Sequence, residues 1–318
     1  MTSKLLSPNP NKYVVFADDS NPEVVELCNL QEANIWLASD INLTHDASDW
    51  KKLTVPEQEY LKQILSFFAA SDGLVGENLA LNFIQEAQIP EVRYFYYFQC
   101  MMEAVHAKVY SQLVNTYISS KEEREKMFAS IHVHPIIHKK SEWAQKWMNQ
   151  ETASFSERLI AFLAVEAIFF AGSFAAIFWI RDRGILSNSL GVANEYISRD
   201  ETLHAEFAAT LYKQYFNDLS RERIEEILLS ALEIEKEFNH HALPDRLLGL
   251  NAELMDKYLE SVTDTWLVTL GLPKKFNATQ PFQFMSTFGQ KRKDLFFEKK
   301  SANYARQTEN KTLDFSMI

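Results

Sequence analysis

A long apolar run at residues 159–180, LIAFLAVEAIFFAGSFAAIFWI, constrains the fold of this chain more than any other feature. About 20 apolar residues are enough for a helix to span a bilayer, and Arg158 and Arg181 flank the run. It is, however, the only such run in 318 residues, and the mean hydropathy of the chain is -0.23. We therefore expect the central helix of a large helical bundle, with apolar residues on every side because neighbouring helices cover it.

One ionisable side chain, Glu166, interrupts the first half of this run. An unpaired carboxylate inside an apolar core either costs several kcal/mol or shifts its pKa until it becomes protonated. Burial of the run therefore requires a group that compensates the charge of Glu166. A metal ion is one such group, and it requires further ligands elsewhere in the chain.

The composition limits the classes of partner. The chain has 32 basic and 43 acidic residues and a net charge of -11, which disfavours binding to a phosphate backbone. Its N-terminus shows no secretory signal pattern, and Cys28 and Cys100 form no C-x-x-C motif. We therefore expect a cytoplasmic protein that binds neither nucleic acid nor membranes.

Helical periodicity dominates the chain, and only 8 glycines and 9 prolines interrupt it. Residues 1–30 contain three prolines and are expected to form an N-terminal arm, followed by one helical domain at residues 31–288. Thr54 is the expected N-cap of the first long helix, and residues 289–318 are expected to form a flexible tail. Further helices are predicted at about residues 91–118, 121–129, 141–149, 157–183, 189–216, 220–239 and 251–270.

Two E-x-x-H pairs supply candidate metal ligands. The segment CMMEAVHAKVY contains Glu103 and His106, and SRDETLHAEF contains Glu201 and His204. Residues three apart share one face of a helix, so each pair can direct a carboxylate and an imidazole to a common point. A single pair of this kind is common by chance, whereas two pairs together are a stronger signal.

Two further carboxylates complete a candidate ligand set. Asp72 lies on the buried stripe of the helix that follows Thr54, and Glu166 lies in the apolar run. Glu77 and Glu86 are rival acids that lie off this stripe. Two E-x-x-H pairs with two more carboxylates are the pattern of ferritin-like di-iron and di-manganese bundles, and four carboxylates balance the charge of two divalent cations. The prediction is an all-α, ferritin-like helical bundle with a di-metal carboxylate site in its core.

The same segments carry a family resemblance. FFAASDGLVGENL, MMEAVHAKVYS, ERLIAFLAVEAIFFAGSFAAIFW and NEYISRDETLHAEFA resemble the four ligand helices of the class I ribonucleotide reductase small subunit, most closely the eukaryotic type. The similarity extends from about Trp36 to the C-terminus. It implies an enzyme subunit that makes a radical and passes it to a large subunit, which reduces ribonucleoside diphosphates to the deoxyribonucleotides used in DNA replication.

The resemblance assigns roles to individual residues. Two iron ions per chain, joined by an oxide derived from O2, are implied, and manganese accepts the same ligands. One ion is assigned to Asp72, Glu103 and His106, and the other to Glu166, Glu201 and His204, with some carboxylates bridging. Tyr110, four residues after His106, matches the tyrosine that becomes the stable radical, although its spacing alone fits ordinary packing. The apolar pocket that shields the radical is matched by Phe170, Phe174 and Ile197.

Other residues match the family residues that carry the oxidising equivalent from the small subunit to the large subunit. Trp36 resembles the tryptophan through which an electron passes, and Asp200 resembles the carboxylate that links it to the metal ligand His106. Tyr304 resembles the tyrosine that relays the radical, and the C-terminal segment with Phe315 resembles the part that docks on the large subunit. Its ending, FSMI, departs from the acidic and aromatic ending of the eukaryotic type. Family members are homodimers.

Three other functions use similar features. A different ferritin-like di-metal oxidase would need a substrate channel beside the metal ions and no docking tail. A scaffold paralogue without catalytic activity should have lost ligands, whereas all six are present in this sequence. Iron storage does not account for the apolar lining or the single tail.

Overall fold

The computed structural model describes residues 3–14, 21–44, 46–243, 247 and 249–285. Contacts between residues divide the chain into two units, Met1–Pro281 and Phe282–Ile318. In the second unit the described part is residues 282–285, where the rings of Phe282 and Phe284 stack with their centroids 5.1 Å apart. The prediction of an all-α fold is confirmed, because the described residues form helices and no strand, with one isolated bridge between Leu247 and Leu250.

The first unit is built from long helices and two π-helical turns, η2 and η3. In chain order its elements are α1 (Pro22–Ala33), η1 (Ala38–Asp40), α2 (Asp46–Trp50), α3 (Val55–Asn78), η2 (Leu79–Phe83), α4 (Ile84–Glu86), α5 (Pro90–Tyr117), α6 (Lys121–Phe128), α7 (Ser130–Val133), α8 (Pro135–Met148), α9 (Phe155–Ala164), η3 (Val165–Phe169), α10 (Ala171–Asp182), α11 (Leu190–Tyr215), α12 (Arg221–Ala242) and α13 (Ala252–Thr269).

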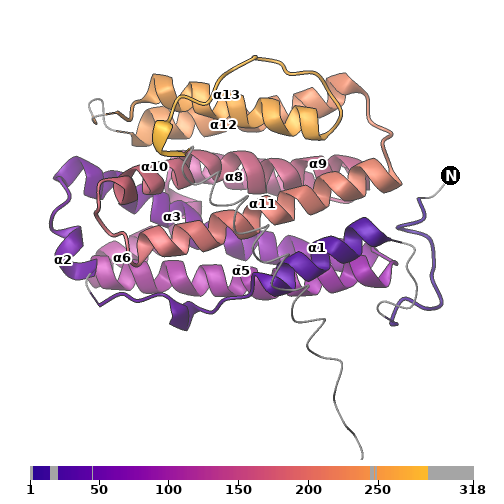
Figure 1. Ribbon diagram of the computed structural model, residues 1–318, viewed down its shortest axis with the longest axis horizontal. Helices are drawn as coiled ribbons and strands as arrows, with labels where there is room; N and C mark the ends of the chain where they lie inside the picture. Colours follow the sequence, from indigo (N-terminus) through magenta and orange to yellow (C-terminus); the bar gives the residue numbers. More distant parts are fainter. Residues whose placement is uncertain (1–2, 15–20, 45, 244–246, 248, 286–318) are drawn as a thin grey trace, which may run out of the picture. The chain divides into compact units, whose positions relative to one another are not determined.

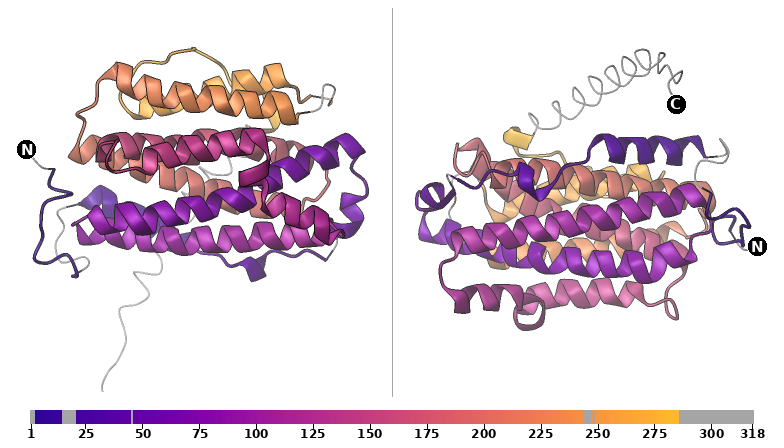
Figure 2. Two further views of the ribbon diagram at one scale, coloured as in Figure 1. Left: turned by 180° about the vertical axis from the view of Figure 1, so that it is seen from behind. Right: turned by 90° about the horizontal axis from the view of Figure 1, so that it is seen from below.

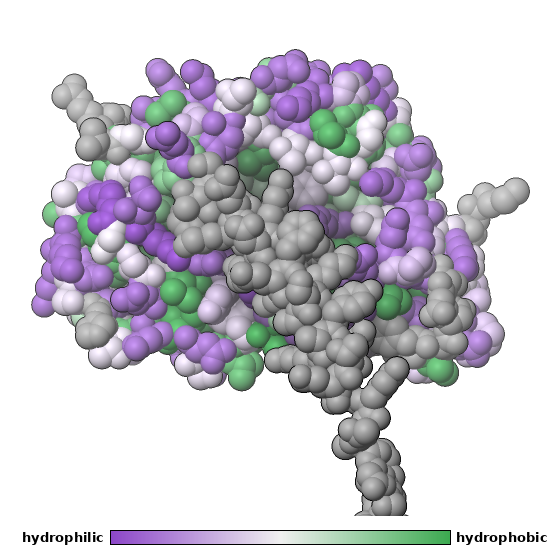
Figure 3. Space-filling model, viewed as in Figure 1, coloured by the Kyte–Doolittle hydropathy of each residue, from purple (hydrophilic) through white to green (hydrophobic). Residues whose placement is uncertain are grey.

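The long helices of this unit pack in layers (Figure 1). Helices α12 and α13 lie side by side, with α12 against α8 and α9 and α13 against α10 and η3, while α5 packs against α3 and against α1 (Figures 1 and 2). Helix α11 contacts α9, α10 and α5, so it joins the layers. On the face drawn in Figure 3, hydrophilic and hydrophobic residues are intermixed across the described surface.

The apolar run forms the central helix α9–η3–α10, as predicted. Within the described part of the chain, two helical stretches are long and apolar enough to cross a membrane by length and composition, Val55–Glu86 and Phe155–Asp182. In the second stretch, which contains the apolar run, 94% of the most apolar window is buried by the rest of the protein. Other helices therefore supply the apolar surroundings of this run.

Local sequence signals set several helix ends. Thr54 is the N-cap of α3, as predicted, and its side chain accepts a hydrogen bond from the backbone N–H of Glu57. The Glu57 carboxylate accepts one in return from the backbone N–H of Thr54, which completes a capping box. Ser154 and Glu157 form the same arrangement at the start of α9. These caps satisfy backbone donors that a helix start leaves free.

Several expected boundaries differ from the structure. Helix α1 begins at Pro22, inside the expected arm, because proline is compatible with the first helical turn, and it buries Val24 and Cys28. Helix α8 likewise begins at Pro135, earlier than the predicted residue 141. Cys28 and Cys100 are free thiols.

Candidate metal centre

Four helices bring the six predicted ligand residues together in the core. Helix α3 supplies one of them, α5 two, η3 one and α11 two. Each of the six is at most 2% exposed. The six residues are Asp72, Glu103, His106, Glu166, Glu201 and His204. All of the candidate ligands named from the sequence therefore share one buried site.

Their ligand atoms form two overlapping groups. Oxygen and nitrogen atoms of Glu103, Glu166, Glu201 and His204 lie within 4.8 Å of one another, and so do those of Asp72, Glu103 and His106. Glu103 belongs to both groups. This arrangement suits two cations with a carboxylate between them, because each oxygen of Glu103 can face a different ion.

Short contacts hold the two imidazoles between the carboxylates. His106 Nδ1 lies 2.9 Å from Glu201 Oε1 and 3.5 Å from Glu103 Oε2. His204 Nδ1 lies 2.9 Å from Glu201 Oε2 and 3.1 Å from Glu103 Oε1. Gln99, which the sequence interpretation missed, places its amide nitrogen 3.4 Å from Glu103 Oε1 and 3.3 Å from Glu166 Oε1. Its position four residues before Glu103 on the same helix face was the available signal.

The electrostatics of the site favour positive charge at its centre. Burial, together with the charge of Glu103, raises the pKa of Asp72 well above its usual value. Burial and the charge of Glu201 do the same to the pKa of Glu166. Although burial lowers the pKa of His204, hydrogen bonds to Glu103 and Glu201 raise it to about 9. The protein alone therefore leaves an excess of buried negative charge that protons or metal ions can neutralise.

Unsatisfied polar atoms show that the residues fit a pair of metal ions. Buried polar side-chain atoms are hydrogen-bonded in most proteins, so a cluster of exceptions needs an explanation. Carboxylate oxygens and imidazole nitrogens are donors suited to iron and manganese. The site atoms that lack a hydrogen bond are Asp72 Oδ2, Glu103 Oε2, His106 Nδ1, Glu166 Oε2, Glu201 Oε1 and His204 Nε2.

A hydrogen-bonded chain runs from the site toward Trp36. Asp200 Oδ2 accepts a hydrogen bond from Trp36 Nε1 at 2.7 Å and lies 3.2 Å from His106 Nε2. The indole of Trp36 also stacks on the His106 ring, with centroids 5.7 Å apart. Because an ionised carboxylate only accepts, Nε2 of His106 would donate to Asp200, which leaves Nδ1, on the side of Glu103 and Glu201, as the nitrogen that would bind a metal ion. Trp36, Asp200 and His106 therefore contact one another in this order, which is the order that the resemblance implied.

Tyr110 lies in an aromatic pocket near the carboxylates. Its hydroxyl is buried and has no hydrogen-bond partner, and its ring stacks on Phe68 at 4.7 Å. Phe68 also contacts Phe170 and Phe174, at 5.6 Å and 5.2 Å. Burial and the charge of Asp72 raise the pKa of the Tyr110 phenol well above its usual value. Phe68 is therefore a pocket residue in ring contact with Tyr110, and the sequence interpretation did not assign it to the pocket.

Three predicted residues take no part in the contacts described above. Ile197 is buried on α11, four residues before Glu201. Tyr304 and Phe315 lie outside the described residues.

Comparisons with known proteins agree over most of the chain. The profile of the family described as "Ribonucleotide reductase, small chain" matches residues 14–281. The chain is 46% identical to the ribonucleoside-diphosphate reductase small chain of Trypanosoma brucei brucei, covering 95% of this chain and 89% of that protein. It is 42% identical to subunit M2 of the human enzyme, covering 95% and 77%.

Solved structures give the same fold. The Rnr4 homodimer of Saccharomyces cerevisiae, a ribonucleotide reductase protein, superposes with a TM-score of 0.83 at 30% identity and covers 95% of this chain and 93% of that chain. The dimanganese(II) NrdF protein of Streptococcus sanguinis superposes with a TM-score of 0.78 at 20% identity, covering 86% and 98%. The second likeness concerns the fold alone.

Proposed function

Because this chain belongs to the ribonucleotide reductase small-chain family, we propose that it stores an oxidising equivalent as a radical on Tyr110, next to two iron ions. The chain is the small subunit of an oxidoreductase, ribonucleoside-diphosphate reductase. The observation that carries the proposal is the set of six buried ligand residues with unsatisfied atoms, close to a buried tyrosine whose hydroxyl has no partner.

The six residues divide between the two ions as their contacts suggest. Asp72 and His106 hold one ion, Glu166 and His204 the other, while Glu103 contributes to both groups. Glu201 contacts both imidazoles, so it stands between the two positions. When bound, the two iron ions would activate dioxygen, which would then oxidise Tyr110. Manganese fits the same donor atoms, and the donor set alone does not select between the two metals.

Tyr110 starts as a neutral phenol, and its oxidation would transfer one electron and the hydroxyl proton to dioxygen, which is reduced at the site. Its raised pKa keeps the proton on the oxygen until oxidation, and no hydrogen bond holds that proton in place. The rings of Phe68, Phe170 and Phe174 exclude water and reductants, and the family resemblance assigns Ile197, which is buried on α11, to the same apolar lining. Such a pocket lengthens the lifetime of a neutral radical because water and dissolved reductants do not reach the phenol ring.

Trp36, Asp200 and His106 provide a path for an electron. The indole N–H of Trp36 donates a hydrogen bond to Asp200, and Asp200 accepts one from Nε2 of His106. These two hydrogen bonds fix the positions of the three side chains. The stack between Trp36 and His106 brings the indole close to the metal site. Trp36 therefore passes an electron toward the site when the radical is used.

Partner contacts complete the proposal. The large subunit receives the radical through Tyr304, and the tail at residues 289–318 docks on it with Phe315 as an anchor. The chain forms a homodimer and acts in the cytoplasm, where ribonucleoside diphosphates are the substrates of the assembled enzyme.

Electron paramagnetic resonance tests the radical. The metal-free protein is loaded anaerobically with iron(II), oxygen is admitted, and the spectrum is recorded with the iron content. Wild type should give a tyrosyl signal with about two irons per chain. Tyr110→Phe should lose the signal and keep the iron. Tyr96→Phe is the matched control, because Tyr96 is also buried on α5 with no hydrogen bond on its hydroxyl, and it should keep the signal.

Other outcomes would change the assignment. Two irons and oxygen consumption without a tyrosyl signal in wild type would contradict the role of Tyr110 and favour a di-metal oxidase or manganese loading. A protein that binds no iron and no manganese would contradict the proposed site itself.

A further inference from the structure

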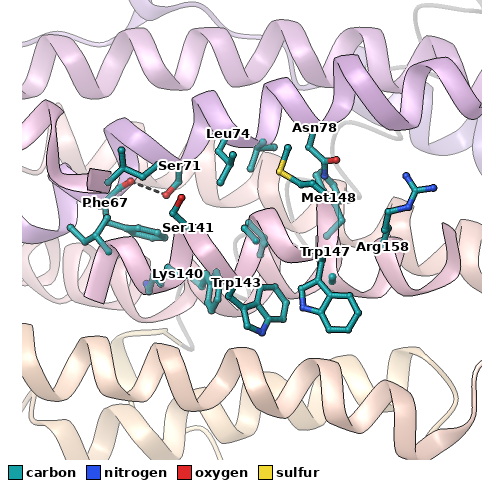
Figure 4. Close-up of a pocket in the computed structure, with 18 residues that line it drawn as sticks. Phe67, Ser71, Leu74, Asn78, Lys140, Ser141, Trp143, Trp147, Met148 and Arg158 are labelled. Atoms are coloured by element: carbon teal, nitrogen blue, oxygen red, sulfur yellow. Dashed lines mark hydrogen bonds between the residues drawn. The ribbon is translucent and has the colours of Figure 1, made fainter. Parts of the chain in front are cut away.

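A second buried charge cluster contacts the helix that carries Glu166. Lys140 of α8 and Glu235 of α12 form an ion pair, with Nζ and Oε2 2.5 Å apart and side chains 1% and 0% exposed. Figure 4 shows Lys140 on α8 with Phe67 of α3 among the residues that line one pocket. The ammonium lies over the rings of Phe67 and Phe238, at 3.7 Å and 3.9 Å from their centroids. None of the roles proposed above uses this pair.

Each member of the pair also binds the backbone of the central helix. Lys140 Nζ donates a hydrogen bond to the carbonyl oxygen of Phe169 at 3.1 Å. The Glu235 carboxylate lies against the backbone of Gly172, whose N–H lowers the pKa of the carboxyl group, and it accepts a hydrogen bond at 2.8 Å from the side-chain amide of Asn239. The ammonium of Lys140 thus lies at the backbone carbonyl of Phe169, and the carboxylate of Glu235 lies at the backbone amide three residues later in the chain.

These backbone groups flank the point where the helix changes register. The π-helical turn η3 ends at Phe169, and the α-helix α10 begins at Ala171. A change from π-helical to α-helical hydrogen bonding leaves backbone groups at the junction short of helical partners, and buried groups need partners. A carboxylate at the first amides of α10 and an ammonium at the last carbonyl of η3 also complement the two helix dipoles.

Gly172 makes the contact with Glu235 possible. A Cβ atom at this position would lie 2.6 Å from Glu235 Oε1 and 2.6 Å from Asn239 Nδ2, closer than real contacts allow. The approach of the carboxylate to the helix backbone therefore depends on a residue without a side chain.

We propose that the Lys140–Glu235 pair fixes the register of η3 and thereby positions Glu166 among the metal ligands. Glu166 lies in this turn, three residues before the carbonyl that Lys140 binds. Phe170, next to that carbonyl, belongs to the aromatic pocket of Tyr110 through its contact with Phe68. Lys140 and Glu235 are positioning residues, because they act on the site through the backbone. The part of the proposal that concerns metal rests on the proposed function.

Hydrogen exchange of the metal-free, full-length protein tests the hold on the turn. Mass spectrometry follows peptides that cover residues 165–174. Lys140→Met should raise exchange there by about tenfold or more, because the junction opens more often. Arg158→Met is the control: Arg158 is a buried arginine of α9, paired with Glu86 at 2.5 Å, and its loss should leave residues 165–174 unchanged relative to wild type.

Calorimetric titration with Mn²⁺ tests the effect on the site. Wild type should bind two ions per chain, and Lys140→Met should bind Mn²⁺ about tenfold more weakly, in the range seen when residues that orient metal ligands are removed. Arg158→Met should bind Mn²⁺ as wild type does. Gly172→Ala, which displaces Glu235, should reproduce the effects of Lys140→Met.

Each alternative result decides the question. Equal exchange of residues 165–174 in Lys140→Met and Arg158→Met would overturn the proposal, and so would faster exchange with unchanged Mn²⁺ affinity. If Lys140→Met does not fold, Glu235→Gln, which keeps the side-chain volume and removes the charge, is judged by the same two criteria. If wild type binds no Mn²⁺, the proposed function fails with the metal part of this proposal, while the exchange result still shows whether the pair holds the turn.

Discussion

Two clusters of buried charge contact the central helix α9–η3–α10, and they differ in how their charge is balanced. The ligand cluster around Glu166 holds four carboxylates and two imidazoles, and six of its polar atoms have no hydrogen bond. The Lys140–Glu235 cluster holds one cation and one anion, both of which also bind the backbone. The first cluster is incomplete without added positive charge, whereas the second is balanced by the protein.

This difference separates a ligand site from a structural site. Burial raises the pKa of Glu235 to about 7 and lowers the pKa of Lys140, but the partner opposes the shift in each case. In the ligand cluster the charge with the largest effect on Asp72, and on Glu166, is another carboxylate, which adds to the effect of burial, although His106 and His204 oppose it at Asp72. Buried charge alone is therefore weak evidence for a metal, and unsatisfied atoms with like-charged neighbours are strong evidence.

The largest expected effect comes from breaking the balanced cluster. Lys140→Met leaves the carboxylate of Glu235 buried without a cation and should lower the free energy of unfolding by about 3–5 kcal/mol. The double variant Lys140→Met/Glu235→Leu removes both charges and should recover part of this loss. We expect it to remain about 2 kcal/mol below wild type, because the Phe169 carbonyl and the Gly172 amide lose their partners.

Urea unfolding of the metal-free proteins measures these differences. A double variant as stable as wild type would show that the pair does not serve the helix junction. Equal stability of the single and double variants would show that the buried charge itself costs nothing.

The unbalanced cluster should respond most to the loss of Glu103. Glu103→Ala removes the carboxylate shared by both ligand groups, so affinity for Mn²⁺ should fall by about 100-fold or more at both positions, which is about 2.7 kcal/mol. Glu77→Ala is the control, since Glu77 is an exposed acid of α3 and should not affect binding. Calorimetry reports both variants. Retention of one tightly bound ion in Glu103→Ala would contradict a shared role.

The sequence predicted the unbalanced cluster and missed the balanced one, for physical reasons. The three-residue spacing of the two E-x-x-H pairs can be recognised in the sequence, and so can the single charge of Glu166 in an apolar run. Lys140 and Glu235 lie in ordinary amphipathic helices 95 residues apart, where charged residues are common. Only the packing of α8 and α12 against the central helix turns them into a pair.

Backbone details were also beyond the sequence. Nothing in residues 165–169 marks a π-helical turn, because the composition suits an α-helix equally well. Pro22 was assigned to the N-terminal arm, and the helix that begins at Pro135 was predicted to begin only at residue 141, although proline at the first turn is compatible with a helix start. The helices themselves were predicted well, because their apolar residues recur at a helical period.

The next prediction is that the same substitution, glutamate to glutamine, changes stability in opposite directions in the two clusters. In metal-free protein, Glu166→Gln should raise the free energy of unfolding by about 1 kcal/mol, because it removes repulsion from Glu201 and Glu103 while an amide oxygen can still accept from Gln99. Glu235→Gln should lower it, because it leaves the ammonium of Lys140 buried without an anion. Urea unfolding in the presence of a chelator measures both. Changes of the same sign would erase the distinction between the clusters.

The smallest expected effect concerns Glu57, a carboxylate balanced by the protein at a helix start. Burial raises the pKa of Glu57, but hydrogen bonds from Thr54 and the charge of Arg183 outweigh burial and bring it below the usual 4.5. A carboxyl group with a lowered pKa stabilises the fold when ionised, so its contribution is complete above about pH 5 and is lost as the pH falls below 4.5. Glu57→Gln should therefore cost about 0.5–1 kcal/mol at pH 7 and less at pH 3.5. Comparison of urea midpoints for Glu57→Gln and wild type at the two pH values measures the change, and a difference that grows on acidification would mean that burial, not the cap, controls this carboxylate.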